Sequence, residues 1–344
     1  MSLARAIAIG DLAELPSRRD EDWRWTDLRG LIRQLPPASA ALDAPQSRGP
    51  FDGLARETVC IPNGELAARI LAMADDQVMA LRVIGEGDGA HTAAPKFKVG
   101  EGRLVLLESY EGAGGYLSEI DLTFEIGPGG EVERIVLADE SEAAVSVSRA
   151  DVTLAPGAKF AQTVIAAGAR RQRIETRVAH AGGGATVRLD GVYLLAHQRH
   201  ADITTVVTHD GRDGTTDQLT KGVVRDQARG VFQGRIVVAE GADKTDAKMG
   251  HHALILSERA EVDAKPELEI FADDVACAHG NTVGALDDDA LFYAEQRGIP
   301  EAEARAMLTE AFVGEVVDRI EHEGAREVVR AWVAERLRGP RHAV

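Results

Sequence analysis

The chain has 344 residues, of which 28% are charged and 44% hydrophobic, and its formal net charge is −17. Such a length suggests about two domains, and so acidic a chain repels nucleic acid and anionic membranes. No apolar run is long enough for a transmembrane helix. The two cysteines, Cys60 and Cys277, are typical of a reducing compartment, and the first eleven residues do not read as a signal peptide. We therefore expect a cytoplasmic protein with no nucleic-acid or membrane partner.

Residues 1–75 predict a helical N-terminal region that prolines interrupt. A charged stretch contains Trp23 and Trp25, and a linker with Pro, Ala and Ser follows over residues 35–50. A short helix is expected over residues 65–74, because Leu66, Ile70 and Met73 recur at helical spacing.

Residues 76–284 change to a period of two, which is typical of strands. The clearest alternation lies in residues 103–108, 120–126 and 235–238. Two hundred residues of strand without a helical stripe indicate a sandwich, a barrel or a β-solenoid. Small residues recur at predicted corners with spacings of 28, 27, 43, 14 and 18, namely Gly130, Ala158, Ala185, Ala228, Ala242 and Ala260. Small corner residues let coils stack closely, which favours an irregular β-helix; a large sandwich with ordinary turns is the alternative.

Residues 285–344 return to helical spacing. Asp287 and its neighbours can cap a first helix, and Gly298-Ile299-Pro300 separates it from the next. Apolar residues then form broad stripes, made of Leu308, Phe312, Val316 and Ile320 and, after Gly324, of Ala325, Val328, Val329, Trp332 and Val333. Stripes this broad predict helices that pack on each other or on a partner.

Several common catalytic motifs are missing from the sequence. It contains no P-loop, so we expect no ATP site on this chain, and it contains neither H-E-x-x-H nor G-x-S-x-G. Without a C-x-x-C motif and with two cysteines in all, a self-contained site of four thiolates is excluded.

The most suggestive cluster is the string Asp-Asp-Val-Ala-Cys-Ala-His-Gly, which ends at Gly280. Cys277 and His279 are two residues apart, so on a strand they point to the same face. Thiolate and imidazole suit iron, zinc or copper, and two ligands supply half of a site that another chain would complete. From the residues alone, a buried free cysteine and a hydrogen-bonded histidine are the favoured interpretation. Asp273 and Asp274 are adjacent, so on a strand they diverge, which argues against acid–base catalysis.

The remaining candidates are weaker. His197, His200 and His209 lie close in sequence, and His251 and His252 are adjacent, so at most one of that pair can join a given site. Each of these five is expected to be a surface or turn residue. Cys60 lies in an apolar context and is expected to be structural.

The sequence resembles the SufB/SufD family, the scaffold subunits of SUF iron–sulfur cluster assembly. The resemblance rests on residues 254–280, with the Asp-Asp-Val-x-Cys-x-His-Gly string, and on Leu-Phe-Tyr at 291–293 and Arg-Gly-Ile at 297–299. Residues 221–224, 232–236 and the tryptophan-containing stretch at 15–26 extend it over nearly the whole chain. SufB-type chains carry Cys-Asp-Ser where this one has Gly250-His251-His252, and Glu where it has Gly280, so the resemblance points to a SufD-type subunit.

The resemblance implies a right-handed parallel β-helix over residues 76–284 between helical regions at 1–75 and 285–344. It further implies a non-catalytic scaffold that pairs with a SufB-type subunit through the β-helix and contacts the SufC ATPase through the C-terminal helices. Cys277 and His279 would then lie at the heterodimer interface and help to hold a transient iron–sulfur cluster shared with the partner. For His279 this outweighs the structural interpretation, and for Cys277 both interpretations stay open.

Three expectations compete with or extend this hypothesis. A metal-dependent β-helix hydrolase or lyase would use Asp273, Asp274 and His279, and would turn over as an isolated chain. A pure interaction module would keep Cys277 and His279 in its core. An uncovered β-helix edge also leaves room for a homodimer of the isolated chain, because unpaired strand groups seek pairing.

Overall fold

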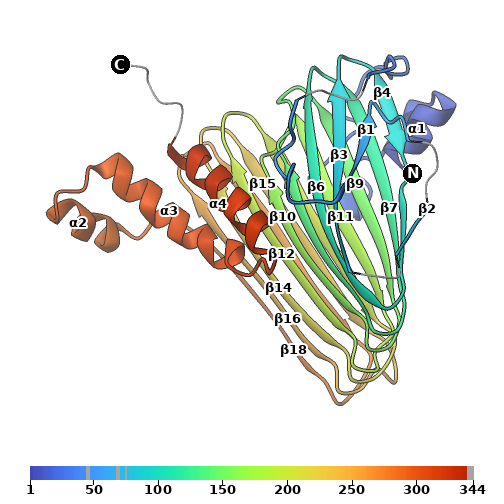
Figure 1. Ribbon diagram of the computed structural model, residues 1–344. Coiled ribbons are helices and arrows are strands. Elements are labelled where there is room, and N and C mark those ends of the chain that lie inside the picture. The colour runs from blue at the N-terminus through green and yellow to red at the C-terminus, as the bar shows by residue number, and fades with distance from the viewer. Residues whose placement is uncertain (44–46, 67–69, 74–75, 339–344) are drawn as a thin grey trace.

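The computed structural model describes residues 1–43, 47–66, 70–73 and 76–338, most of which form a stack of β-strand coils (Figure 1). Two long parallel sheets are the walls of this stack. Sheet 1 contains, in spatial order, β1 (Glu57–Pro62), β3 (Gln77–Glu86), β6 (Gly102–Ala113), β8 (Gly130–Ala138), β10 (Lys159–Ala166), β12 (Thr186–Leu195), β14 (Thr215–Val224), β16 (Asp246–Ile255) and β18 (Ala276–Gly284).

Sheet 2 faces sheet 1 across the core. Its spatial order is β17 (Glu261–Ile270), β15 (Arg229–Val238), β13 (His200–His209), β11 (Arg171–His180), β9 (Val145–Leu154), β7 (Leu117–Ile126), β5 (Lys96–Val99) and β2 (Ile70–Met73), and β4 (Ala90–Ala93) pairs with β7. Because the chain alternates between the two sheets and every named pairing is parallel, the expected parallel β-helix is confirmed and the sandwich is not.

The coils are of nearly constant length. Glu131 pairs with Lys159, Lys159 with Thr186, and Thr186 with Thr215, so these coils repeat after 28, 27 and 29 residues. The irregular spacing of the small corner residues follows from this repeat. Ala158, Ala185 and Ala242 precede strands of sheet 1, whereas Ala228 and Ala260 precede strands of sheet 2, so a spacing of 43 is one and a half coils. All five are buried, as close stacking at a corner requires.

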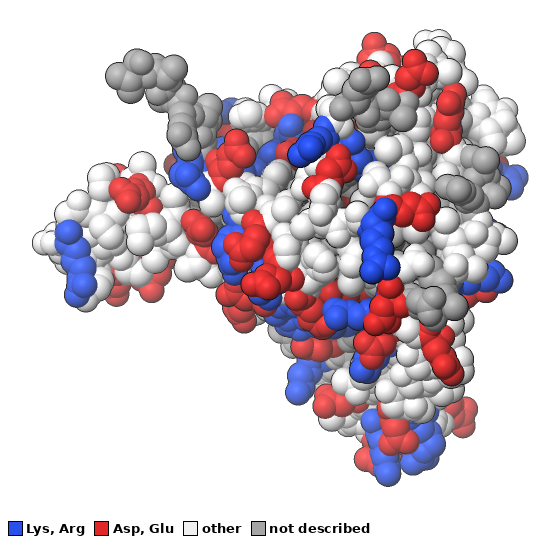
Figure 2. Space-filling view, viewed as in Figure 1, with Lys and Arg blue, Asp and Glu red and all other residues white. Residues whose placement is uncertain are grey.

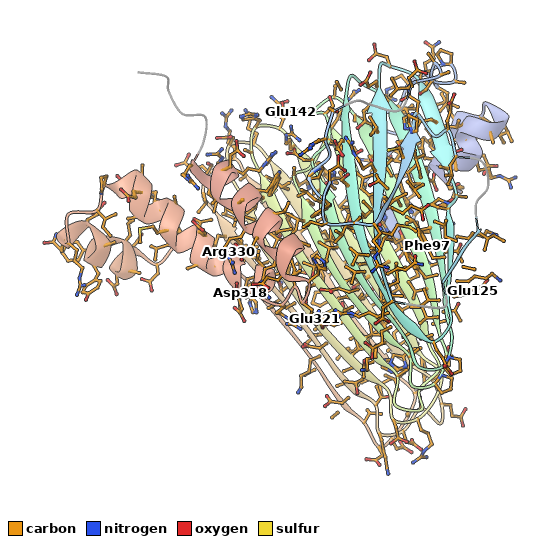
Figure 3. The ribbon with its side chains drawn as sticks, viewed as in Figure 1. Phe97, Glu125, Glu142, Asp318, Glu321 and Arg330 are labelled. Carbon is orange, nitrogen blue, oxygen red and sulfur yellow. The ribbon has the colours of Figure 1, made fainter. Side chains whose placement is uncertain are left out.

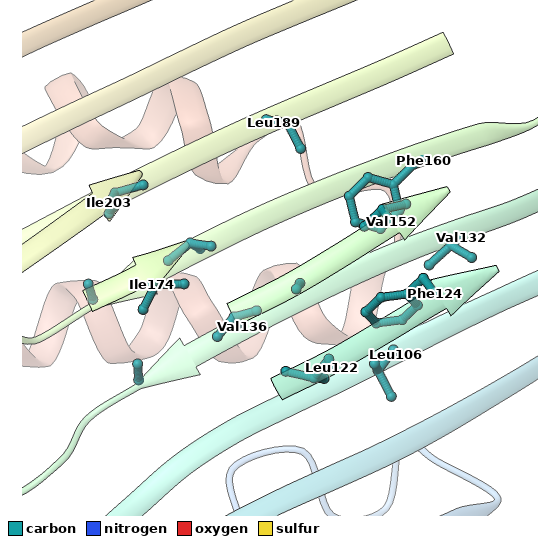
Figure 4. Packing of buried hydrophobic residues seen from close by; sticks show 14 of the residues in the cluster. Leu106, Leu122, Phe124, Val132, Val136, Val152, Phe160, Ile174, Leu189 and Ile203 are labelled. Atoms are coloured by element: carbon teal, nitrogen blue, oxygen red, sulfur yellow. The ribbon is translucent and has the colours of Figure 1, made fainter. Parts of the chain in front are cut away.

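The interior of the solenoid is a continuous apolar ladder. Leu106, Val132 and Leu189 from sheet 1 face Leu122 and Ile174 from sheet 2, and all are buried (Figure 4). The Phe97 and Phe124 rings of neighbouring sheet 2 strands stack with 4.9 Å between their centroids, and the tilted Phe160 ring of sheet 1 packs against Phe124 with 6.0 Å between centroids. Branched and small side chains fill most of the ladder, which accounts for the low aromatic content.

The N-terminal segment lies on the outer face of sheet 2. It contains α1 (Leu3–Ile9) and two single-turn 3-10 helices, η1 (Leu12–Glu14) and η2 (Glu21–Trp23). The Trp23 ring covers the buried Arg173 guanidinium, 4.3 Å from the ring centroid. The Arg173 guanidinium also donates to the backbone oxygen of Asp22 and pairs with Asp202 at 2.7 Å. The segment thereby covers charged residues that would otherwise be exposed on sheet 2.

The helix expected over residues 65–74 is wrong where the structure describes it. Residues 70–73 form β2, and Ile70 pairs with Lys96 of β5. A backbone partner from the next coil overrides the helical spacing of three apolar residues. Residues 67–69 and 74 of the expected helix lie outside the described residues.

The C-terminal helices are α2 (Asp288–Gln296), α3 (Glu301–Val317) and α4 (Glu323–Arg338). As expected, the Asp287 side chain caps α2 by accepting from the backbone N–H groups of Asp289 and Ala290. The buried faces of α3 and α4 pack on the outer surface of sheet 1, where Val316 and Val329 join Leu137 and Val192 in one cluster.

Ion pairs and a projecting segment complete the helical region. Asp318 and Arg330 pair at 2.7 Å between the end of α3 and α4, and Glu321 binds Arg103 and Arg188 of sheet 1 (Figure 3). The predicted stripes therefore pack against the solenoid, whereas α2 and the start of α3 project away from it (Figure 1). Among the described residues, no helix combines the length and apolarity that crossing a bilayer requires.

Candidate functional site at the open edge of the solenoid

The last coil of the solenoid, β17 and β18, ends in an open edge. β18 pairs with β16 on one side, and within the described chain no strand pairs with its other side. Every residue of β18 is exposed except Cys277, which is half-buried. Ile270, the last residue of β17, and Phe271, the first residue of the turn that leads into β18, expose 42% and 64% of their surface. An unpaired strand with exposed apolar neighbours is a surface that readily accepts another chain.

Cys277 and His279 lie on the face of β18 that continues the interior of the solenoid. They pair in register with Ala247 and Met249 of β16, which are both buried. Because side chains two residues apart share a face, Cys277 and His279 point toward the end of the core. Cys277 packs against the apolar cluster that contains Met249 and Phe232, whereas His279 is exposed. The structure therefore brings both candidate ligands to one face of the open edge.

Burial raises the pKa of the Cys277 thiol, with a smaller contribution of the same sign from Asp246. At neutral pH the group is a thiol, and it must lose its proton before it can bind a metal. A cationic partner or the metal itself would supply the stabilisation that this step needs.

The second cysteine belongs to a different part of the molecule. Cys60 lies on β1, at the opposite end of sheet 1 from β18. Eight strand spacings of about 4.8 Å separate the two strands, or roughly 38 Å. Cys60 therefore cannot join a site with Cys277, and burial raises the pKa of its thiol as well.

The expectation that the other histidines are surface or turn residues is wrong for three of the five. His200, His209 and His251 are buried, and burial lowers their pKa values to about 4, about 3 and about 4. All three are neutral at pH 7. Strand alternation does not reveal burial at these positions, because the parts of the chain that cover them come from elsewhere in the sequence: the N-terminal segment covers His200, whose ring contacts the backbone oxygen of Trp25, and neighbouring coils cover His209 and His251.

The other two histidines are nearer to the expectation. The side chain of His197 is 67% exposed and binds Glu142 at 2.7 Å, in a corner that Figure 3 marks by Glu142. His252 is half-buried and contacts the Thr282 hydroxyl on the outward face of β18.

The three residues of the hydrolase hypothesis do not converge. Asp273 and Asp274 lie in the bend between β17 and β18, and not on a strand as the sequence suggested. His279 is the fourth residue of β18, roughly 10 Å along the strand from its first residue. Within the part of the chain that the structure describes, no three His, Cys, Asp or Glu side chains are close enough together to hold a metal ion.

Two residues near the site were not recognised as a pair from the sequence. Asn281 shares the inward face of β18 with Cys277 and His279, and its Oδ1 atom contacts Nδ1 of the buried His251 at 2.7 Å. The only sequence signal was their separation of 30 residues, which is one coil.

A second exposed apolar surface lies on the helices that follow β18 directly in the chain. Phe292 and Tyr293 of α2 expose 61% and 59% of their surface, and Met307 of α3 exposes 51%. In the view of Figure 2 uncharged side chains occupy much of this projecting pair of helices, with charged side chains along its edges. We call these three residues the hairpin patch.

Comparison with known proteins adds to this geometry. Residues 99–312 match the family described as SUF system FeS cluster assembly, SufBD core domain. The iron-sulfur cluster assembly protein SufD of Escherichia coli (strain K12) is 34% identical over 217 residues, which are 63% of this chain and 51% of that protein.

Two further relatives differ in the share of each chain that the match covers. The SufD protein of Bacillus subtilis (strain 168) is 36% identical over 126 residues, 37% of this chain and 29% of that protein. An iron-sulfur cluster assembly SufBD family protein of Mycobacterium leprae (strain TN) is 26% identical over 362 residues, 95% of this chain and 92% of that protein. The match to the Escherichia coli protein thus spans about half of that relative's length.

Proposed function

The chain belongs to the SufB/SufD family as a SufD-type protein, and from that premise we propose that it is a non-catalytic scaffold subunit in iron–sulfur cluster assembly. The observation that carries the proposal is the placement of Cys277 and His279 on one face of an unpaired edge strand. Two ligands at an open edge form half of a site, and the cluster is the cargo that the assembled complex builds and releases.

The partner at this edge is a SufB-type subunit. A strand of that subunit would pair with the free side of β18 and cover the exposed Ile270 and Phe271. The same contact would place the partner's ligands beside His279 and take the thiol of Cys277 further out of water. In an isolated chain a second copy could occupy this edge, so a homodimer through β18 is part of the proposal.

The second partner is the SufC ATPase, which would bind the hairpin patch. Phe292, Tyr293 and Met307 are large apolar side chains that the solenoid does not cover. The sequence has no P-loop of its own, so ATP-driven motion must come from a partner. Motion of α3 would reach sheet 1 through the Val316 cluster. We place the complex in the cytoplasm, in keeping with two thiols that are too far apart to form a disulfide.

The test is reconstitution with the SufB-type and SufC partners. His279→Ala is expected to assemble normally but to lose iron and sulfide, with a fall in cluster affinity of about tenfold or more. The measurements are complex size by gel filtration, and iron and sulfide per complex. Cys277→Ser distinguishes a ligand, whose loss lowers the iron content, from a structural cysteine, whose replacement does not.

The matched control is His197→Ala, which removes an exposed histidine from a corner distant from β18 in sequence. It is expected to leave both assembly and iron content unchanged. A correctly assembled His279→Ala complex with unchanged iron and sulfide would overturn the role of this edge as a ligand site.

A further inference from the structure

A line of hydrogen bonds runs from the core of sheet 1 to the open edge. The hydroxyl of Tyr193 lies 2.9 Å from Nε2 of His251, and Nδ1 of His251 lies 2.7 Å from Oδ1 of Asn281. Tyr193 and His251 are fully buried, on β12 and β16, and Asn281 is exposed on β18. The line therefore joins a surface side chain to two rigid positions in the interior.

The packing around His251 holds its ring in one orientation. The Phe232 ring stacks on it with 4.8 Å between centroids and 3° between planes. Tyr193 reaches His251 by lying across Gly222 of the intervening strand, where an added Cβ would come within 1.9 Å of the tyrosine ring. Any side chain larger than glycine at position 222 would displace Tyr193. The fold thus provides a specific space for this contact.

The direction of the hydrogen bonds follows from the protonation states. Burial lowers the pKa of His251 to about 4, so at pH 7 the ring carries one N–H. Burial also raises the pKa of the Tyr193 hydroxyl, which therefore donates. Nε2 accepts from Tyr193, and Nδ1–H donates to the Asn281 oxygen. Because the Asn281 oxygen accepts this hydrogen bond, the amide N–H₂ group of Asn281 points away from His251 and remains available as a donor.

We propose that Asn281 is a third group of the edge site, which donates hydrogen bonds from its amide to the sulfur atoms of the bound cluster, and that His251 and Tyr193 are its positioning residues. Cys277, His279 and Asn281 alternate along one face, so neighbours in this series are roughly 7 Å apart. N–H groups directed at cluster sulfur stabilise its negative charge and raise its reduction potential. This inference rests on the proposed function, because it needs a cluster at His279.

The test compares cluster properties in the reconstituted complex. Asn281→Ala removes the donors and is expected to lower the reduction potential and to speed cluster release to a chelator by about tenfold. His251→Phe keeps the stack on Phe232 but frees the amide, so it should shift both quantities in the same direction by less. Combining the two should add nothing to Asn281→Ala, because His251 acts only through Asn281. Thr282→Ala, on the opposite face of β18, is the control and should change neither.

A measurement on the isolated chain needs no cluster. The Nδ1 proton of His251 should exchange slowly in the NMR spectrum of the parent chain and faster in Asn281→Ala. Because Asn281 is exposed, Asn281→Ala should fold normally, and the measurement can be made even if His251→Phe does not fold.

The outcomes separate the two hypotheses. If the cluster depends on His279 but Asn281→Ala leaves its potential and its release unchanged, this inference is overturned and the proposed function stands. If His279→Ala leaves the iron and sulfide content of the complex unchanged, both the proposed function and this inference are overturned. Equal effects of Asn281→Ala and Thr282→Ala would also overturn the inference, since they would indicate disturbance of the strand alone.

Discussion

At the scale of single residues, the interior of this solenoid contains charges as well as apolar side chains. Arg134 donates to both oxygens of Glu108 at 2.7 Å, and its third contact is the Gln162 oxygen at 2.7 Å. The Tyr110 hydroxyl also contacts Glu108. Arg134 and Glu108 are both fully buried. Each charge is tolerated there because the other neutralises it and neighbouring polar atoms complete its hydrogen bonds.

Removing one partner of this pair should be strongly destabilising. Glu108→Leu leaves the Arg134 charge buried without compensation, which costs about 3–5 kcal/mol. The free energy of unfolding from urea titration measures this loss. The double variant Glu108→Leu/Arg134→Met removes both charges and should recover most of it.

The control for this prediction is an exposed ion pair. Glu125 pairs with Lys98 on the outer surface, where both side chains are about half exposed (Figure 3). Glu125→Leu should change the stability by less than about 1 kcal/mol. A similar loss in Glu125→Leu and Glu108→Leu would show that burial of the charge is not the cause.

At the scale of elements, the helices differ in how firmly they are held. α4 and the second half of α3 are fastened by a shared apolar cluster with sheet 1, which includes Val313, Val329 and Val333. α2 contributes one buried residue, Leu291, and displays the hairpin patch instead. An element that exposes large apolar side chains while its neighbours are well packed is suited to binding rather than to stability.

Substitution in the hairpin patch should separate partner binding from folding. Phe292→Ser is expected to weaken binding of the SufC ATPase by about tenfold or more, because exposed aromatic side chains dominate such interfaces. Titration calorimetry with the purified ATPase measures the affinity. The melting temperature of the isolated chain should stay within about 2 °C, since the side chain is 61% exposed.

Ile9→Ser is the matched control for this substitution. Ile9 is 56% exposed on α1 and belongs to the N-terminal segment. It should affect neither measurement. Unchanged ATPase binding in Phe292→Ser would reject the hairpin patch as the docking surface.

At the scale of the whole molecule, buried titratable groups of opposite sign set the response to pH. His91, His200, His209 and His251 have pKa values of about 4, 4, 3 and 4 because of burial. Each binds a proton on unfolding below pH 6.5, so each removes stability as the pH falls from 6.5 toward its folded value. Burial raises the pKa values of Glu119 and Asp190 to about 7, so these two groups add stability as the pH falls.

The histidine contribution can be measured one residue at a time. Between pH 6.5 and 4.5 the parent chain is expected to lose stability more steeply than His209→Gln, by about 1.4 kcal/mol per pH unit. Urea titrations at several pH values give the two slopes. Parallel curves for the parent and His209→Gln would contradict the assignment of a buried, neutral His209.

Much of the architecture was predictable because it depends on local periodicity. Alternation with a period of two marked the strands, and small corner residues favoured stacked coils over a sandwich. The prediction of a helix over residues 65–74 was wrong because there a contact distant in sequence, and not the local periodicity, decides the structure. Its three apolar residues fit a helical face, but the backbone of Ile70–Met73 pairs with β5, some 26 residues away.

That Cys277 and His279 share a face follows from the sequence alone, since side chains on any strand alternate, and the sequence also contains the motif by which the family is recognised. Three other facts are visible only in the folded chain: β18 is an open edge, His251 is buried beneath Asn281, and Trp23 covers Arg173. These facts depend on coils about 30 residues apart and on a segment 150 residues away. Periodicity can be read from the residues of one strand, whereas burial depends on the other parts of the chain that pack against that strand.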